Sequence, residues 1–248
     1  MPGFSARPVG AGAAFWTSTD NTAVNTAILL PLGSVVEARD GRMYRWAKAG
    51  ISDLVAGNVI QAPAQLANYQ AATVTTVPIG STSIGFTPGA TAAAANLFAE
   101  GFLAITVSTG LGYIYKVSSH PANAGSVLMT VQLDPADPIQ VATVTATTKG
   151  DLVHNPYQNV IQSPVTTLTG LPVGVAPYII TAAQNGWLQT YGPAAVLTKG
   201  TPGPGLPVSV PGSAAGAVVI NTAALHIVGY MMETGVDAST NAVFLTLG

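Results

Sequence analysis

The sequence predicts an all-β protein built from sandwich or barrel subdomains, with an extended N-terminal arm and at most one or two short helices. Three observations predict this fold class. Short runs of β-branched and aromatic residues recur along the chain, turn signals separate them at regular spacing, and the 248 residues include 27 Gly and 18 Pro. Gly and Pro interrupt helices and favour tight turns. Many short strands separated by regular turns are typical of sandwiches and barrels.

We expect three segments: an arm at residues 1–30, an N-terminal β domain at 31–160 and a C-terminal β domain at 161–248. The arm is rich in Gly, Ala, Thr and Asn and has no clear period. Its aromatic pair, Phe15 and Trp16, either anchors the arm on a neighbouring subunit or covers this chain's own core, and the residues alone favour neither. The sequence pattern changes near residue 160, because proline interrupts the strands that follow.

A hairpin is predicted at the start of the N-terminal domain. Residues 34–38 and 42–48 have the composition of strands, and Asp40-Gly41 lies between them. Asp-Gly is a strong hairpin signal because both residues tolerate positive φ. Alternation along the second strand places Arg45 on the face opposite to Tyr44 and Trp46.

Further strands follow, and two segments are helix candidates: residues 62–72, with a proline near the start, and residues 92–98, where alanines dominate. A second hairpin is expected from residues 102–107 and 113–117, because the loop between them contains two glycines. The remaining strand candidates are residues 53–61, 73–79, 126–133, 138–145, 151–154, 187–191, 217–220, 227–232 and 243–247.

Charge is scarce throughout the chain. Only 7% of residues are charged, against roughly 25% in an average domain, and the net charge is −2. A nucleic-acid partner requires a basic face, which 8 Lys and Arg cannot supply. No apolar run approaches membrane-helix length, and the N-terminus lacks a secretory signal pattern, so we expect no membrane partner. The absence of Cys excludes disulfides and suits assembly in a reducing cytoplasm.

Candidate catalytic and metal-binding residues each have a simpler structural explanation. His120, His154 and His226 have no acidic or His partner at metal-ligand spacing, so we interpret them as strand-end or surface residues. Asp134 and Asp137 could form a glycosidase pair, but each precedes a proline, and Asp before Pro is common in turns. We therefore predict that the chain is not an enzyme and needs no metal and no cofactor.

Two groups of side chains leave a binding role open. The basic cluster comprises Arg39, Arg42, Arg45 and Lys48. It either contacts an acidic surface of a neighbouring protein or forms a solvated hairpin, which we favour, partly neutralised by Glu37, Asp40 and Asp53.

The second group consists of Trp46 and Trp187, which could form a sugar-binding shelf together with tyrosines. We favour core positions for both, because large rings contribute most to burial in a core otherwise built of Ala and Val.

Patterns across residues 32–248 resemble the capsid decoration (cement) proteins of tailed phages. They begin with LGSVV at 32–36, DGRMYRWAKAG at 40–50 and LVAGNVIQ at 54–61. They continue with GFLA at 101–104, GLGYIYKV at 110–117, SHPA at 119–122, LPVGVA at 171–176, GWLQT at 186–190, GPAAV at 192–196, IVGY at 227–230 and VFL at 243–245. These are patterns of turns and strands, and none is a catalytic signature.

The resemblance implies a structural virion protein on the outer surface of an icosahedral phage head, assembled in the host cytoplasm. Its partners would be the major capsid protein and itself, as a homotrimer. The arm would link subunits or bind the capsid, and the candidate capsid or subunit contacts are Phe15, Trp16, Arg39, Arg42, Arg45 and Lys48. Two alternatives remain: a phage receptor-binding or tail-spike module that recognises glycan, and a polysaccharide depolymerase, which usually shows clustered carboxylates.

Overall fold

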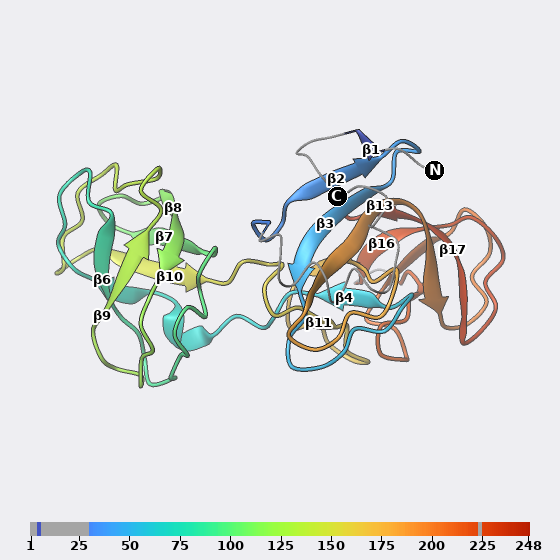
Figure 1. Cartoon of the computed structure of the whole chain (residues 1–248). Helices are drawn as coiled ribbons and strands as arrows, with labels where there is room; N and C mark the ends of the chain where they lie inside the picture. Colours follow the sequence, from blue (N-terminus) through green and yellow to red (C-terminus); the bar gives the residue numbers. More distant parts are fainter. Residues whose placement is uncertain (1–3, 6–29, 223–224) are drawn as a thin grey trace. The chain divides into compact units, whose positions relative to one another are not determined.

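The computed structural model describes residues 4–5, 30–222 and 225–248, and it confirms the predicted all-β fold class (Figure 1). The chain divides into two compact units. Residues Met1–Pro63 and Pro156–Gly248 form one, here called the sheet unit, and Ala64–Asn155 form the other, here called the barrel unit. The barrel unit is therefore an insertion within the sheet unit. Most of the expected arm, including Phe15 and Trp16, lies outside the described residues.

This division differs from the boundary that we expected near residue 160. Residues 31–63 belong with the C-terminal part of the chain because their strands pair with strands beyond residue 160. In particular, Trp46 lies opposite Trp187, and Val59 lies opposite Val175. A boundary inferred from composition cannot detect such pairing, because hydrogen bonds between distant strands leave no local signal.

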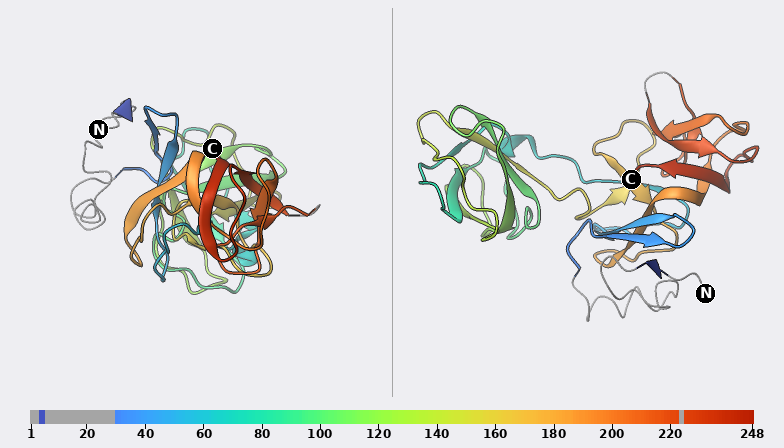
Figure 2. Two further views of the ribbon diagram at one scale, coloured as in Figure 1. Left: turned by 90° about the vertical axis from the view of Figure 1, so that its right-hand side faces the viewer. Right: turned by 90° about the horizontal axis from the view of Figure 1, so that it is seen from above.

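The sheet unit contains one strongly curved sheet of 11 strands. Its main path runs through β1 (Phe4–Ser5), β2 (Val35–Ala38), β3 (Met43–Lys48), β13 (Asn185–Thr198), β17 (Ser239–Thr246), β16 (His226–Met231), β14 (Pro207–Val210) and β15 (Val219–Ile220). Three strands lie off this path: β4 (Val59–Gln61), β11 (Ile161–Gln162) and β12 (Pro172–Val175). In Figure 2, β3 in blue, β13 in orange and β17 in red lie side by side.

The hairpin predicted at Asp40-Gly41 is confirmed. β2 and β3 pair antiparallel with Val36 opposite Tyr44. The Ala38 amide donates to the Arg42 carbonyl, the Gly41 amide donates to the Ala38 carbonyl, and Gly41 has a φ of +82°. A three-residue loop that ends in a left-handed glycine matches the right-handed twist of the strands that it joins.

Strand β13 organises the sheet unit, because its first half pairs with β3 and its second half with β17. The pairing with β3 shifts register between Gln189 and Tyr191. Beyond this bulge, the Gln189 side-chain amide donates to the carbonyls of Tyr191 and Pro193, at 3.2 and 2.8 Å. The Gln189 side chain thus satisfies two carbonyls of β13 near Met43, where the pairing with β3 stops, as required of polar groups near a core.

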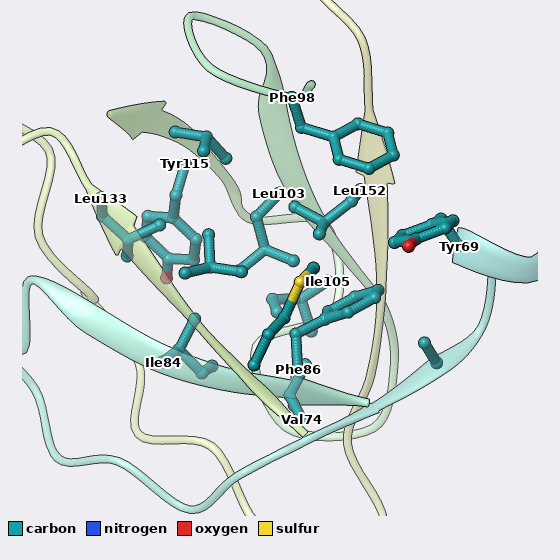
Figure 3. Packing of buried hydrophobic residues seen from close by; sticks show 14 of the residues in the cluster. Tyr69, Val74, Ile84, Phe86, Phe98, Leu103, Ile105, Tyr115, Leu133 and Leu152 are labelled. Atoms are coloured by element: carbon teal, nitrogen blue, oxygen red, sulfur yellow. The ribbon is translucent and has the colours of Figure 1, made fainter. Parts of the chain in front are cut away.

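The barrel unit is a closed barrel of six strands in the order β10-β5-β6-β9-β8-β7. These strands are β5 (Ala72–Val74), β6 (Ser83–Thr87), β7 (Phe102–Val107), β8 (Ile114–Ser119), β9 (Met129–Leu133) and β10 (Lys149–Val153). Alternate residues point inward, as the strict buried and exposed alternation of β9 shows. Figure 3 shows the inward side chains, among them Phe86, Leu103, Tyr115 and Leu152, which fill the interior.

Three local predictions require correction. Residues 62–72 contain only the three-residue 3-10 helix η2 (Ala67–Tyr69), and residues 92–98 form a turn with no helix. Asn96 and Glu100 have positive φ, and Ala93 pairs with Asn123 in a β-bridge, so tertiary contacts override the helix propensity of alanine. Residues 138–145 form a loop, bound to the barrel through threonine side chains such as Thr143, whose hydroxyl donates to the Thr75 carbonyl.

Candidate functional site

A depression of about 670 Å³ lies in the sheet unit where β13 leaves β3 and continues along β17. One cation and one anion line it, Arg42 and Glu233, and the bulge residue Gln189 lines it as well. The rest of the lining is small or apolar: Ala56, Gly57, Val175, Pro177, Pro193, Ala194, Ala195, Thr240, Asn241 and Ala242. Charged residues are scarce in this chain, so two opposite charges beside one depression mark it as a candidate binding site.

The polar groups of the depression already have partners in the fold. The Arg42 Nε lies 2.8 Å from Asp40 Oδ2, and the guanidinium lies 6.0 Å from the centre of the Tyr44 ring. Burial opposes ionisation of Asp40, but hydrogen bonds from the Arg42 backbone and side chain hold the pKa of this carboxyl below its usual value. Glu233 accepts a hydrogen bond from the Ala242 amide at 2.8 Å. These bonds hold the Arg42 guanidinium and the Glu233 carboxylate in fixed positions beside the depression.

The Asn241 side chain is also structural. Its Oδ1 accepts from the Val236 amide, and its Nδ2 donates to the carbonyls of Val236 and Ser239. The lining therefore presents two fixed charges among small and apolar residues. Such a surface suits recognition of another molecule.

The basic cluster is spread along the hairpin and does not form one patch. Arg39 is exposed in the loop, and Arg42 pairs with Asp40. Arg45 donates to the Gly33 carbonyl at 3.1 Å, with its guanidinium 5.6 Å from the centre of the Tyr157 ring. Lys48 lies at the far end of β3, about 20 Å from Arg42 at the usual rise per strand residue.

Asp40 neutralises the charge of Arg42, as we predicted for a solvated hairpin. Asp53 instead accepts the Ala182 amide at 2.7 Å. A role of the basic residues in contact with a partner remains a prediction, because the structure contains this chain alone.

The two tryptophans of the described part belong to the core, as we favoured. Trp46 and Trp187 are 1% and 5% exposed and pack with Val36, Ala38 and Tyr44. Burial raises the pKa of Tyr44 to about 12, so its hydroxyl stays protonated at physiological pH. Neither indole can therefore form a sugar-binding shelf in this structure.

A different set of rings lies exposed or half-buried on the other half of the sheet. Residues Pro193, Phe244, Tyr230 and Pro207 lie directly opposite one another on β13, β17, β16 and β14. Tyr230 is 43% exposed, and Tyr191 packs edge-on against Phe244 with ring centroids 5.2 Å apart. We call Tyr191, Pro193, Pro207, Tyr230 and Phe244 the aromatic row. The sequence alone does not reveal this row, because its alignment across four strands depends on their register.

Exposed apolar side chains occur on both units. In the described part, 21 large hydrophobic residues are exposed, more than the 8 basic and 10 acidic residues of the whole chain together. On the barrel unit, Val107, Leu111, Tyr113 and Ile114 gather on the β7–β8 hairpin. On the sheet unit, Tyr230 and Met232 lie at the end of β16.

All three histidines lie at the start or just past the end of a strand, as predicted, but they differ in exposure. His226 is exposed at the start of β16. His120 and His154 are buried, at 3% and 8% exposure, and their rings both contact Phe98. They lie 34 positions apart in the sequence, so only the closed barrel reveals that they converge. The described residues include no group of three or more His, Cys, Asp and Glu that could hold a metal.

The aspartates of the Asp-Pro pairs are turn residues, as expected. Asp134 accepts the Ala136 amide at 3.0 Å, and Asp137 accepts the Lys116 amide at 2.8 Å. The Asp137 amide in turn donates to the Asp134 carbonyl. Both carboxylates thus complete the loop after β9.

Within the described ranges, no helix is long and apolar enough to cross a membrane. No model of a known protein family matches the chain, and neither a curated protein nor a solved structure matches it. The chain's own surface and its sequence patterns are therefore the basis for assigning a function.

Proposed function

We propose that this chain is a structural virion protein that decorates the outer surface of an icosahedral phage head and stabilises it. The observation that carries the proposal is the surface, where exposed large hydrophobic residues outnumber all charged residues of the chain. Several of these residues are neighbours, on the β7–β8 hairpin and in the aromatic row, and contiguous apolar patches mark interfaces. The resemblance of residues 32–248 to decoration proteins names the kind of partner, the major capsid protein.

The proposed mechanism is burial of apolar surface at many repeated contacts. Each square ångström of apolar surface removed from water contributes about 25 cal/mol before the costs of association. The two units carry separate apolar sets, on the β7–β8 hairpin and around the aromatic row. One chain could then bind two neighbouring sites on a shell. Because the two contacts are linked in one chain, together they bind more tightly than either contact alone. A homotrimer would multiply these contacts further.

Reconstitution tests this proposal. Purified chain is added to phage shells that lack their decoration protein, and binding is measured by co-sedimentation while the shell's melting temperature is recorded. We expect saturable binding and a higher melting temperature. Protein that stays in the supernatant and leaves the shell's melting temperature unchanged contradicts the proposal. Light scattering tests the trimer, where a mass of one 25.0 kDa chain contradicts it.

The aromatic row supports a second candidate, a receptor-binding or tail-spike module that recognises glycan. Exposed rings stack on the apolar faces of sugars, and Tyr191 and Tyr230 also offer hydroxyl groups. A glycan array separates the two candidates. Reproducible binding to one sugar class that is lost in Tyr230→Ala, without binding to shells, favours glycan recognition.

A further inference from the structure

One end of the barrel is closed by the turn at residues 94–101, here called the capping turn. The turn leads into the start of β7, whereas His120 follows the end of β8 and His154 follows the end of β10. Because β7 is antiparallel to both β8 and β10, these three positions lie at the same end of the barrel. Two histidines that are distant in sequence therefore meet one turn.

The side chain of Phe98 anchors the capping turn between aromatic rings. It is fully buried, with ring centroids 4.7 Å from Tyr69, 5.5 Å from His120 and 4.7 Å from His154. Figure 3 shows Phe98 near Tyr69 and Leu152 at this end of the core. The position of the turn thus depends on both imidazole rings staying in place.

Hydrogen bonds define the protonation state of His120. Its Nε2 accepts the Phe98 amide at 3.0 Å, so this nitrogen carries no proton. Its Nδ1 lies 2.8 Å from the Pro121 carbonyl and must be the protonated nitrogen, which donates to that oxygen. A second proton on Nε2 would place an N–H group against the N–H of Phe98. Protonation of His120 is therefore incompatible with the bond that holds Phe98.

A second proton on His154 would also be unfavourable. Its ring is hydrogen-bonded to the backbone of Leu97, and its Nδ1 is buried without a partner among the described residues. A proton on Nδ1 would put an unpaired N–H and a positive charge beside the ring of Phe98. Both histidines must therefore be neutral while the capping turn is closed.

We infer that His120 and His154 form an acid-sensitive latch, which holds the capping turn on the barrel when both rings are neutral and releases it when they are protonated. Backbone strain in the turn favours its release, because Glu100 adopts a left-handed φ of +58°, which is rare for a non-glycine residue. This inference does not depend on the proposed virion function.

Burial is the main cause that lowers the pKa of both histidines below 6.5, and the bonds to Pro121 and Leu97 oppose it only partly. The other titratable groups on the segments around the rings are Glu100 in the turn and Tyr69 on η2. Tyr69 donates its hydroxyl to the Thr91 carbonyl, and burial raises its pKa. No charged side chain contributes to either histidine shift.

Amide hydrogen exchange on the full chain between pH 7.5 and 5.0 tests the latch, with peptide-resolved mass spectrometry after correction for intrinsic rates. We expect the protection factor of residues 94–101 to fall by about tenfold per pH unit for each histidine that titrates, while the sheet unit keeps its protection. His120→Gln, which retains an acceptor for the Phe98 amide, and His154→Phe, which retains the ring contact, should each remove one proton from this dependence. The double variant should remove it entirely.

His226→Gln is the matched control, because His226 is exposed on the sheet unit, and it should leave the dependence unchanged. A double variant with the pH dependence of the wild type would overturn the latch. If the variants fail to fold, NMR titration of the wild-type imidazole Cε1–H signals decides. We expect the His120 and His154 signals to titrate with midpoints below the ordinary imidazole pKa of about 6.5, and midpoints at or above that pKa would overturn the inference.

Discussion

Trp187 lies directly opposite Trp46 on the neighbouring strand, and their ring centroids are 4.9 Å apart with the ring planes at 61°. This edge-to-face pair joins β3 to β13, which are separated by more than a hundred residues and by the whole barrel unit. The contact therefore joins the two segments of the sheet unit that flank residues 64–155 in the sequence.

Truncation of this pair should weaken the sheet unit. We expect Trp187→Ala to lower the free energy of unfolding by about 3–5 kcal/mol, because it leaves a cavity against Trp46. Urea unfolding monitored by circular dichroism measures the change. Ile51→Ala is the control, since Ile51 is 97% exposed and its truncation should change stability by less than about 0.5 kcal/mol. Equal effects of the two variants would contradict a structural role for the pair.

The bulge of β13 should depend on the donor group of Gln189. Gln189→Glu replaces an amide that donates to the Tyr191 and Pro193 carbonyls with a carboxylate that can only repel them. We expect a loss of about 2–3 kcal/mol at pH 7, measured by urea unfolding. Gln132→Glu introduces the same charge at an exposed position of β9 and should be nearly neutral. A Gln189→Glu protein as stable as this control would show that the bonds contribute little.

Acid should destabilise the barrel unit before the sheet unit. The folded-state pKa values of His120 and His154 lie below the unfolded value of about 6.5, so the unfolded chain binds more protons between these limits. Stability is full above pH 6.5 and falls as the pH drops toward the folded pKa values, at up to about 1.4 kcal/mol per pH unit for each histidine. Calorimetry from pH 7.5 to 5.0 should show the barrel transition moving to lower temperature. A barrel transition with no pH dependence in this range would contradict both assignments.

Surface substitutions should separate partner binding from folding. Leu111→Ser on the β7–β8 hairpin removes an exposed group and should change stability by less than about 0.5 kcal/mol, whereas Tyr230→Ser also loses its cross-strand contacts and should cost about 1 kcal/mol. Under the proposed function, each should weaken binding to shells by at least about tenfold, and the two together should weaken it more than either alone. Thr201→Ala, at an exposed loop position, is the control. Unchanged binding of the double variant would exclude these surfaces as the docking sites.

Local sequence signals predicted several elements correctly because their physical cause is local. Asp40-Gly41 specifies a hairpin through its own φ preferences, and Asp134 specifies a turn through its bond to the Ala136 amide two residues on. Alternation placed Tyr44 and Trp46 on a buried face. The same reasoning failed at residues 92–98, because the partners that hold this turn, Asn123 and His120, lie more than twenty residues away.

By itself, the sequence determined the all-β class, the turns, the scarcity of charge and the tryptophans of the core. Only the tertiary structure decided that residues 64–155 form a separate barrel, because that depends on β3 pairing with β13 across the insertion. It also decided that His120 and His154 meet at Phe98 and that the aromatic row lines up across four strands. Turn preferences act between neighbouring residues, whereas strand register and burial depend on residues that only the closed sheet and barrel bring together.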